Sequence, residues 1–84
     1  MQELQTHFAG RGETKGFLFT QLEKTEKGYI YLVTDASGKK WYEVFNRKEN
    51  TQFGCISYPT AKAFGLWAWT LLTREASENK LNSF

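Results

Sequence analysis

The chain has 84 residues, a formal net charge of +2 and one cysteine. A chain of this length forms one small domain, and a single thiol excludes an internal disulfide, which favours a reducing compartment. The longest apolar run, Phe64 to Leu72, is far shorter than the ~20 residues of a membrane-spanning helix, and the polar start MQELQTHF does not resemble a signal peptide. We therefore expect a cytoplasmic protein with no membrane contact. The small net charge does not by itself indicate nucleic acid or acidic lipid as a partner.

The first residues are polar and are followed by closely spaced glycines. Leu4 and Phe8 have the i, i+4 spacing of a short amphipathic helix, but a frayed terminus is the simpler interpretation. The run GRGETKG then adds a flexible lead-in. We predict that residues 1–14 form a flexible N-terminal segment.

Three stretches rich in aromatic and β-branched residues predict an antiparallel meander of strands, at 17–24, 29–34 and 41–46. The two connections, 25–28 and 35–38, each end in glycine after three residues that suit a type I turn. This pattern is typical of a three-residue hairpin loop with a glycine in the left-handed conformation. The predicted register places Thr25 opposite Tyr29 and Asp35 opposite Lys39.

Strand alternation then gives the sheet two different faces. The aliphatic face holds Leu18, Leu22, Ile30, Leu32, Tyr42 and Val44. The aromatic face holds Phe17, Phe19, Tyr29, Tyr31, Val33, Trp41 and Phe45, with Gln21, Glu23 and Glu43 among them. We expect a helix to cover the aliphatic face.

The stretch 58–78, YPTAKAFGLWAWTLLTREASE, has helical periodicity. Its apolar stripe consists of Ala61, Phe64, Gly65, Ala68, Leu71, Leu72 and Ala76. Thr60 suits the N-cap, the helix is expected to end between residues 77 and 79, and residues 80–84 are a predicted tail. A short strand is predicted at 53–57. The predicted fold is α+β: a single domain at 15–79 in which a three- or four-stranded antiparallel meander packs against one C-terminal α-helix.

Few residues indicate chemistry. His7 lies in the N-terminal segment, and Cys55 lies in an apolar strand with no histidine nearby, which favours a structural thiol. The chain has no CxxC or HExxH motif for a metal, and GRGETKG lacks the spacing of a phosphate loop. Glu23 and Glu43 share a predicted face, but we expect them to keep it soluble or to pair with basic residues. We predict a protein that is not an enzyme and has no catalytic residue, metal, cofactor or small-molecule substrate.

The aromatic face is the main functional clue, because a sheet covered on one side by a helix normally has a polar second face. Residues 1–14, a second copy of the chain or a partner must cover these rings. The run KKWYEVFNRK interleaves basic and aromatic residues, as in surfaces that neutralise phosphates and stack on bases, although strand alternation alone gives the same pattern. The predicted partner-binding residues are Tyr29, Tyr31, Lys39, Lys40, Trp41, Glu43, Phe45, Arg47 and Lys48. The first hypothesis is nucleic-acid binding; the alternative is protein binding through the same face, as a homodimer or as a regulator of a larger protein.

A hairpin-linked three-stranded sheet followed by a helix, here GYIYLVTDASGKKWYEVF and then YPTAKAFGLWAW, resembles the AP2-like family, which includes the arm-type DNA-binding domains of transposon and phage integrases. In that family the sheet enters the DNA major groove and the helix supports it. The resemblance implies DNA contacts from Tyr31, Lys40, Trp41 and Glu43. It covers about half of the chain, and the segment 46–57 departs from the family layout.

Overall fold

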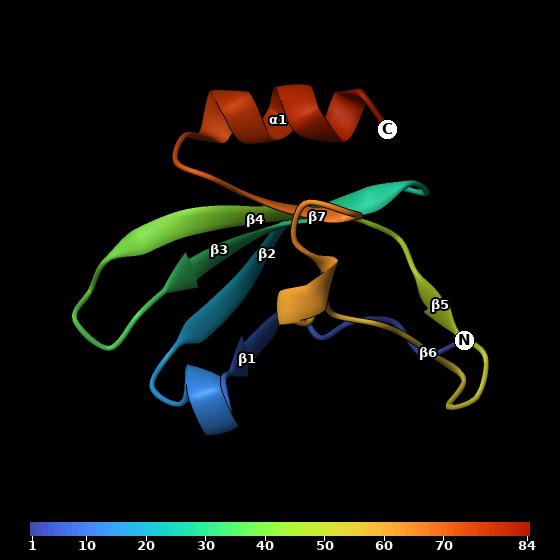
Figure 1. The fold of residues 1–84 in the computed structure, drawn as a ribbon, viewed down its shortest axis with the longest axis horizontal. Helices are drawn as coiled ribbons and strands as arrows, with labels where there is room; N and C mark the ends of the chain where they lie inside the picture. Colours follow the sequence, from blue (N-terminus) through green and yellow to red (C-terminus); the bar gives the residue numbers. More distant parts are fainter.

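The computed structural model describes all residues, 1–84, and contains a five-stranded antiparallel sheet with one C-terminal helix on one side (Figure 1). The strands, in spatial order, are β1 (His7–Ala9), β2 (Leu18–Lys24), β3 (Gly28–Thr34), β4 (Lys40–Asn46) and β7 (Ala68–Leu71). A separate small sheet pairs β5 (Glu49–Asn50) with β6 (Cys55–Ile56), and two 3-10 turns, η1 (Gly12–Thr14) and η2 (Ala61–Ala63), precede β2 and β7. The helix is α1 (Arg74–Asn82). The predicted fold class is confirmed, with five strands in the main sheet.

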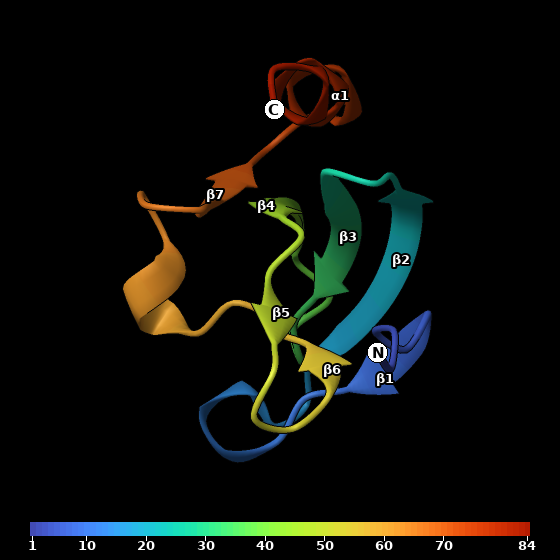
Figure 2. The same cartoon turned by 90° about the vertical axis from the view of Figure 1, so that its right-hand side faces the viewer.

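The sheet curves into an open trough (Figure 2), with α1 on the outer side and the N-terminal segment, β5, β6 and η2 on the inner side. The outer side is the predicted aliphatic face. Ile30, Val44 and Leu81 form its buried cluster, and Leu22, Tyr42, Leu71 and Phe84 pack around them. The helix therefore covers the face to which the sequence assigned it.

The helix itself was predicted in the wrong place. Residues 61–63 form only a 3-10 turn, Gly65 has a φ of +88°, and residues 68–71 form the edge strand β7. Pairing with β4 alternates the side chains, so that Ala68 faces the aromatic core while Trp69 faces the helix side. The true helix begins after Thr73, whose side-chain oxygen accepts a hydrogen bond from the backbone N–H of Ala76 at 3.1 Å.

The C-terminal end of the chain also differs from the prediction, because α1 continues through Asn82 and so includes most of the expected tail. Phe84 packs on Trp69, with ring centroids 5.6 Å apart. At 9 residues, α1 is much too short to cross a bilayer, and no other helix of the structure is suited to do so.

The register between β3 and β4 is as predicted, with Leu32 opposite Tyr42 and Ile30 opposite Val44. The register between β2 and β3 is not: Lys24, and not Thr25, pairs with Tyr29, and a β-bulge at Leu22 separates the pairs Gln21–Tyr31 and Glu23–Ile30. The extra residue reverses the alternation after it. Glu23 was therefore assigned to the wrong face: it lies on the helix side, where its carboxylate meets Arg74 at 3.4 Å.

The two hairpin turns differ from one another. The turn at 35–38 is as predicted: Gly38 has a φ of +91°, and the carboxylate of Asp35 accepts hydrogen bonds from the backbone N–H groups of Ser37 and Lys39, both at 2.9 Å. Gly28 does not have a positive φ and starts β3. A Cβ at Gly28 would lie 2.8 Å from the ring of Phe84 and closer still to a backbone oxygen of β4, so this glycine is required by close packing.

The aromatic face is the main core of the protein. Tyr29, Tyr31, Val33 and Phe45 are all 0% exposed. The parity predicted for β3 and β4 is correct. Of the covers expected for these rings, the N-terminal segment is the one observed, together with a later part of the chain, so the rings do not form the partner surface that was predicted. Residues 1–9 cover them from one side, with Leu4 and Phe8, and residues 55–67 from the other, with Ile56, Tyr58, Ala63 and Trp67.

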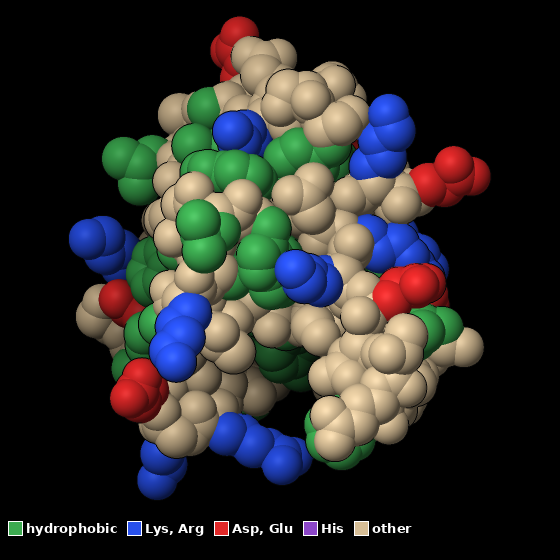
Figure 3. Space-filling view, turned by 45° about the vertical axis from the view of Figure 1, so that its right-hand side comes forward, with side chains coloured by type: hydrophobic (Ala, Val, Ile, Leu, Met, Phe, Trp, Pro, Cys, Tyr) green, Lys and Arg blue, Asp and Glu red, His purple; other side chains and the backbone are tan.

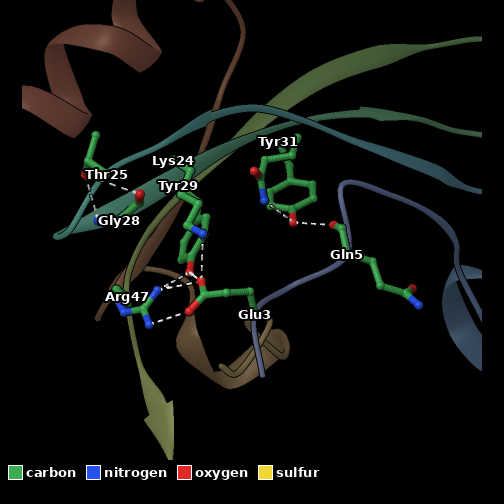
Figure 4. A network of polar contacts seen from close by, with 9 residues as sticks. Glu3, Gln5, Lys24, Thr25, Gly28, Tyr29, Tyr31 and Arg47 are labelled. Carbon is green, nitrogen blue, oxygen red and sulfur yellow. Dashed lines mark hydrogen bonds and ion pairs between the residues drawn. The ribbon is translucent and has the colours of Figure 1, made fainter. Parts of the chain in front are cut away.

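The N-terminal segment is fixed to the sheet instead of being free. β1 pairs with β2, and Gln2 exchanges backbone hydrogen bonds with Gly54 and Ile56. Figure 4 shows the polar contacts beside this pairing: the carboxylate of Glu3 accepts a bidentate pair of hydrogen bonds from Arg47, at 2.6 and 2.7 Å, and a hydrogen bond from the hydroxyl of Tyr29 at 2.9 Å. Lys24 adds an ion pair to Glu3 at 3.3 Å. A bidentate guanidinium–carboxylate pair has a defined geometry, so it sets the position of the segment.

The Glu3 contacts predict how stability depends on acid. Hydrogen bonds from Arg47 and Tyr29 lower the pKa of Glu3 from 4.5 to about 2, so the stabilisation is complete above pH ~4.5 and is lost as the pH falls towards ~2. The Glu3→Gln variant should show a shallower decline of the unfolding temperature across this interval, measured by circular dichroism. Glu26→Gln, in an exposed turn without an ion pair, is the charge-matched control and should behave like the unaltered chain.

The core assignment predicts the cost of removing one ring. Phe45→Ala should lower the free energy of unfolding by about 3–5 kcal/mol, because Phe45 is fully buried between other rings. Phe53→Ala should change it by less than about 0.5 kcal/mol, because Phe53 is 73% exposed. Urea denaturation measures both, and equal effects would contradict the assignment.

Candidate functional site: an aromatic groove at one end of the sheet

Part of the aromatic face stays open. At the end of the sheet where β2 and β4 begin, a groove of ≈ 1220 Å³ lies between the N-terminal segment with η1 and the chain from Tyr58 to Phe64. Its apolar lining consists of Phe8, Ala9, Phe17, Phe19, Trp41, Tyr58, Pro59, Ala61 and Phe64. Its charged residues are Arg11, Glu13 and Glu43.

The groove exists because the rings of the sheet extend beyond the segments that cover them. Alternation in β4 places Trp41, Glu43 and Phe45 on the same face. Phe45 lies deep in the core, whereas Trp41 and Glu43 are only partly buried, nearer the start of the strand. The ring of Phe17 packs edge-on against Trp41, with centroids 5.6 Å apart.

Glu43 is the central polar group of the groove. Its Oε1 accepts a hydrogen bond from the hydroxyl of Tyr58 at 2.7 Å, and its Oε2 accepts one from the indole N–H of Trp41 at 3.1 Å. Thr70 in β7 lies directly opposite Glu43 and also lines the groove. Thr70 is itself exposed, and Glu43 is partly buried.

Tyr58 joins the groove to the core. Its ring lies within 5.4 Å, between centroids, of those of Phe8, Phe19, Tyr31 and Phe45. Burial and then the neighbouring charge of Glu43 raise the pKa of Tyr58 far above its usual range. The hydroxyl therefore stays protonated and donates to Glu43.

The structure divides the predicted partner-binding residues into three groups. Tyr29, Tyr31 and Phe45 are fully buried and do not reach the surface, so base stacking on them is excluded in this conformation. Trp41 and Glu43 line the groove. The four basic residues lie outside it.

Two of those basic residues have partners within the chain. Arg47 binds Glu3, and the ammonium of Lys48 lies 5.4 Å from the ring centroid of Trp67. Lys39 and Lys40 are exposed at the start of β4. On the side of the molecule drawn in Figure 3, Lys and Arg side chains stand apart from one another, with Asp and Glu side chains among them.

Sequence analysis missed the residues that form the sides of the groove. Phe8 was expected in a flexible segment, Tyr58 just before a helix and Phe64 within that helix. The available signal was the number of large rings outside the strands, since rings in a small domain tend to gather in one core. Their position became visible only when the chain folded back over the sheet.

No three or more His, Cys, Asp or Glu residues are grouped so that they could hold a metal ion. Cys55 is a partly buried free thiol in β6. Comparisons with known proteins add nothing to the site: no family model, curated protein or solved structure matches the chain. The resemblance to the AP2-like family stays a prediction.

The contact between Tyr58 and Glu43 predicts a stability effect. Tyr58→Phe should cost about 1–3 kcal/mol at neutral pH, because Glu43 loses a donor in a partly buried position. The raised pKa of Tyr58 gives a contribution that is complete below pH ~10 and is lost as the pH rises further. The variant should therefore lose stability less steeply above pH ~10 in urea denaturation.

Tyr42→Phe is the matched control, because the hydroxyl of Tyr42 has no hydrogen bond in the structure and its ring packs on the helix side. A change of less than about 0.5 kcal/mol is expected for it at neutral pH. If the two variants lost the same stability, the Tyr58–Glu43 contact would have no special role.

Proposed function

We propose that this chain is a small binding module without catalytic activity, that it acts in the cytoplasm, and that it binds a segment of another protein in the aromatic groove. The observation that carries the proposal is the open groove itself, walled by Phe17, Trp41 and Phe64 while the rest of the aromatic face is closed. Aromatic-lined grooves are a common way to bind extended peptides. The free thiol of Cys55 supports the compartment.

The size of the groove supports a peptide over a small metabolite. Pockets for small ligands have volumes of about 300–1,000 Å³ and enclose most of the ligand. The groove, at ≈ 1220 Å³, exceeds this range and opens to solvent, so a chain segment could lie in it. A second copy of this protein is one source of such a segment.

The charges of the groove support a protein partner over a nucleic acid. Two carboxylates, Glu13 and Glu43, line it beside one guanidinium, Arg11. A phosphate backbone would meet repulsion there, since nucleic-acid affinity depends on the neutralisation of phosphates by Lys and Arg. A polypeptide has no such requirement.

Nucleic-acid binding remains the second candidate because of one specific feature. Lys39 and Lys40 are exposed beside Trp41. The loop that carries Lys15 lies against the turn at 35–38, because a Cβ on Gly16 would be 3.2 Å from the Cβ of Ala36. Basic side chains next to a tryptophan suit a single strand with a stacked base. Such binding would fall steeply as salt rises, whereas binding of an apolar segment would change little.

The proposal predicts that ligand binding depends on Trp41. Random linear peptides displayed on phage, selected on the folded chain, should yield peptides whose affinity falls by at least about 30-fold with Trp41→Ala, the effect of losing one central contact residue. Trp41→Phe, which keeps a ring, should retain part of the affinity. Isothermal calorimetry with the synthetic peptides measures both.

Phe53→Ala is the control for the loss of an exposed ring outside the groove and should leave the affinity unchanged. Peptides that bound all of these variants equally would rule out the groove as the site.

Mixed single-stranded DNA and RNA oligonucleotides at low salt form the second arm of the test. Tight, salt-sensitive binding to them, with no peptide recovered, would favour the second candidate. Sedimentation of the free chain tests self-association.

A further inference from the structure

Glu43 is a carboxylate without a basic partner. The ion pairs of the structure join Glu3 to Lys24 and Arg47, and join Arg74 to Glu23 and Glu78. None involves Glu43, although it is partly buried among aromatic rings. A charge removed from water in apolar surroundings normally has a partner of opposite charge. Two neutral donors, Trp41 and Tyr58, supply hydrogen bonds but no charge.

The free positions on the carboxylate match a guanidinium. Each oxygen of an ionised carboxylate has about two acceptor positions, and Trp41 and Tyr58 occupy one on each oxygen of Glu43. One position remains on Oε1 and one on Oε2. Parallel acceptors of this kind are bound by the two N–H groups of an arginine fork, whereas the ammonium of lysine acts as a point charge.

The tryptophans give an independent indication. The structure has three tryptophans, and two of them have a lysine ammonium on the ring: Lys80 lies 3.9 Å from the centroid of Trp69, and Lys48 lies 5.4 Å from that of Trp67. Trp41 has no such cation, yet it faces the groove beside the unpaired carboxylate. A cation bound to Glu43 would lie beside this indole, the one tryptophan that carries no lysine of the chain on its ring.

The chain does not supply this cation itself. Arg11 lines the same groove, but it lies on an exposed turn and makes no ion pair with Glu43. Its backbone N–H and C=O are hydrogen-bonded to the hydroxyl of Thr14 at 3.2 and 3.0 Å, within the turn.

We infer that the groove binds an arginine side chain of the partner protein, with the guanidinium paired to Glu43 and lying against Trp41. This inference rests on the proposed function, because it names the side chain that the bound segment contributes. It also explains why the groove combines rings with a carboxylate: the rings contact the aliphatic stem of the arginine, and Glu43 binds its head.

The test compares two small probes of similar shape, n-propylguanidinium and n-propylurea, which differ in charge. Binding is followed by NMR, through the indole N–H signal of Trp41, which the Trp41→Phe variant identifies. The guanidinium should shift this signal in a saturable way at millimolar concentration, and the urea should bind at least about tenfold more weakly. Equal binding of both probes, or shifts spread over the whole surface, would overturn the inference.

Two pairs of variants locate the cation. Glu43→Gln should weaken the guanidinium at least about tenfold, whereas Glu26→Gln, with the same change of net charge outside the groove, should have no effect. Thr70→Arg tests the site without altering Glu43: position 70 is exposed and lies opposite Glu43, so the new guanidinium should occupy the carboxylate and exclude the probe. Thr70→Gln is its uncharged control and should still bind.

The outcomes separate this inference from the proposed function. Peptides that depend on Trp41 but contain no arginine, or that bind equally after their arginine is replaced by glutamine, would reject the inference and leave the peptide groove in place. If Trp41→Ala affected no peptide and the guanidinium did not bind, both would be rejected. Peptides that share one arginine, lose at least about tenfold affinity on its replacement and fail to bind Thr70→Arg would support both.

Discussion

The burial of Tyr58 against the aromatic face is the interaction on which the rest of the structure depends. Its ring contacts Phe8 from the N-terminal segment, Phe19 from β2, Tyr31 from β3 and Phe45 from β4. Because these rings come from the N-terminal segment, three strands and the segment after β6, the face can close only when residues 1–9 and 55–67 both reach the sheet. In a domain of 84 residues, no other set of side chains offers as much apolar area to bury.

The same constraint explains the two sides of the sheet. The aromatic side is covered by irregular chain, whose own backbone is satisfied by pairing: β1 with β2, β5 with β6, and Gln2 with the β6 region. The aliphatic side is covered by one short helix. The ion pair between Glu3 and Arg47 then fixes the N-terminal cover at the edge, where apolar contacts alone would leave its position loosely defined.

The groove follows from the length of the covering segments. They close the part of the face around Tyr29, Tyr31 and Phe45, but Trp41, Phe17 and Glu43 lie nearer the other end of the strands and remain accessible. A carboxylate that hydrogen-bonds to Trp41 and Tyr58 and keeps acceptor positions free can serve both structure and binding. The proposed arginine ligand is the chemical complement of that arrangement.

The sequence was sufficient to predict the features that depend on residues close together in the chain. It determined the three central strands, the glycine turn at 35–38, the register of β3 with β4 and the separation of aliphatic from aromatic residues, because turn geometry and strand alternation act over a few neighbours. It also indicated Trp41 and Glu43, which lie in the groove.

Tertiary structure decided the rest. The stretch 68–71 has helical periodicity, yet it is a strand because β4 offered an unpaired edge, and Phe8 and Tyr58 became core because rings distant in sequence bury one another. The bulge at Leu22 places Glu23 on the helix side of the sheet. Tyr31 and Phe45, which the sequence suggested as partner-binding residues, are fully buried in the core. Sequence periodicity shows which side chains share a face of the sheet. Whether that face is exposed to solvent depends on distant segments of the chain that fold over it, and periodicity does not reveal those contacts.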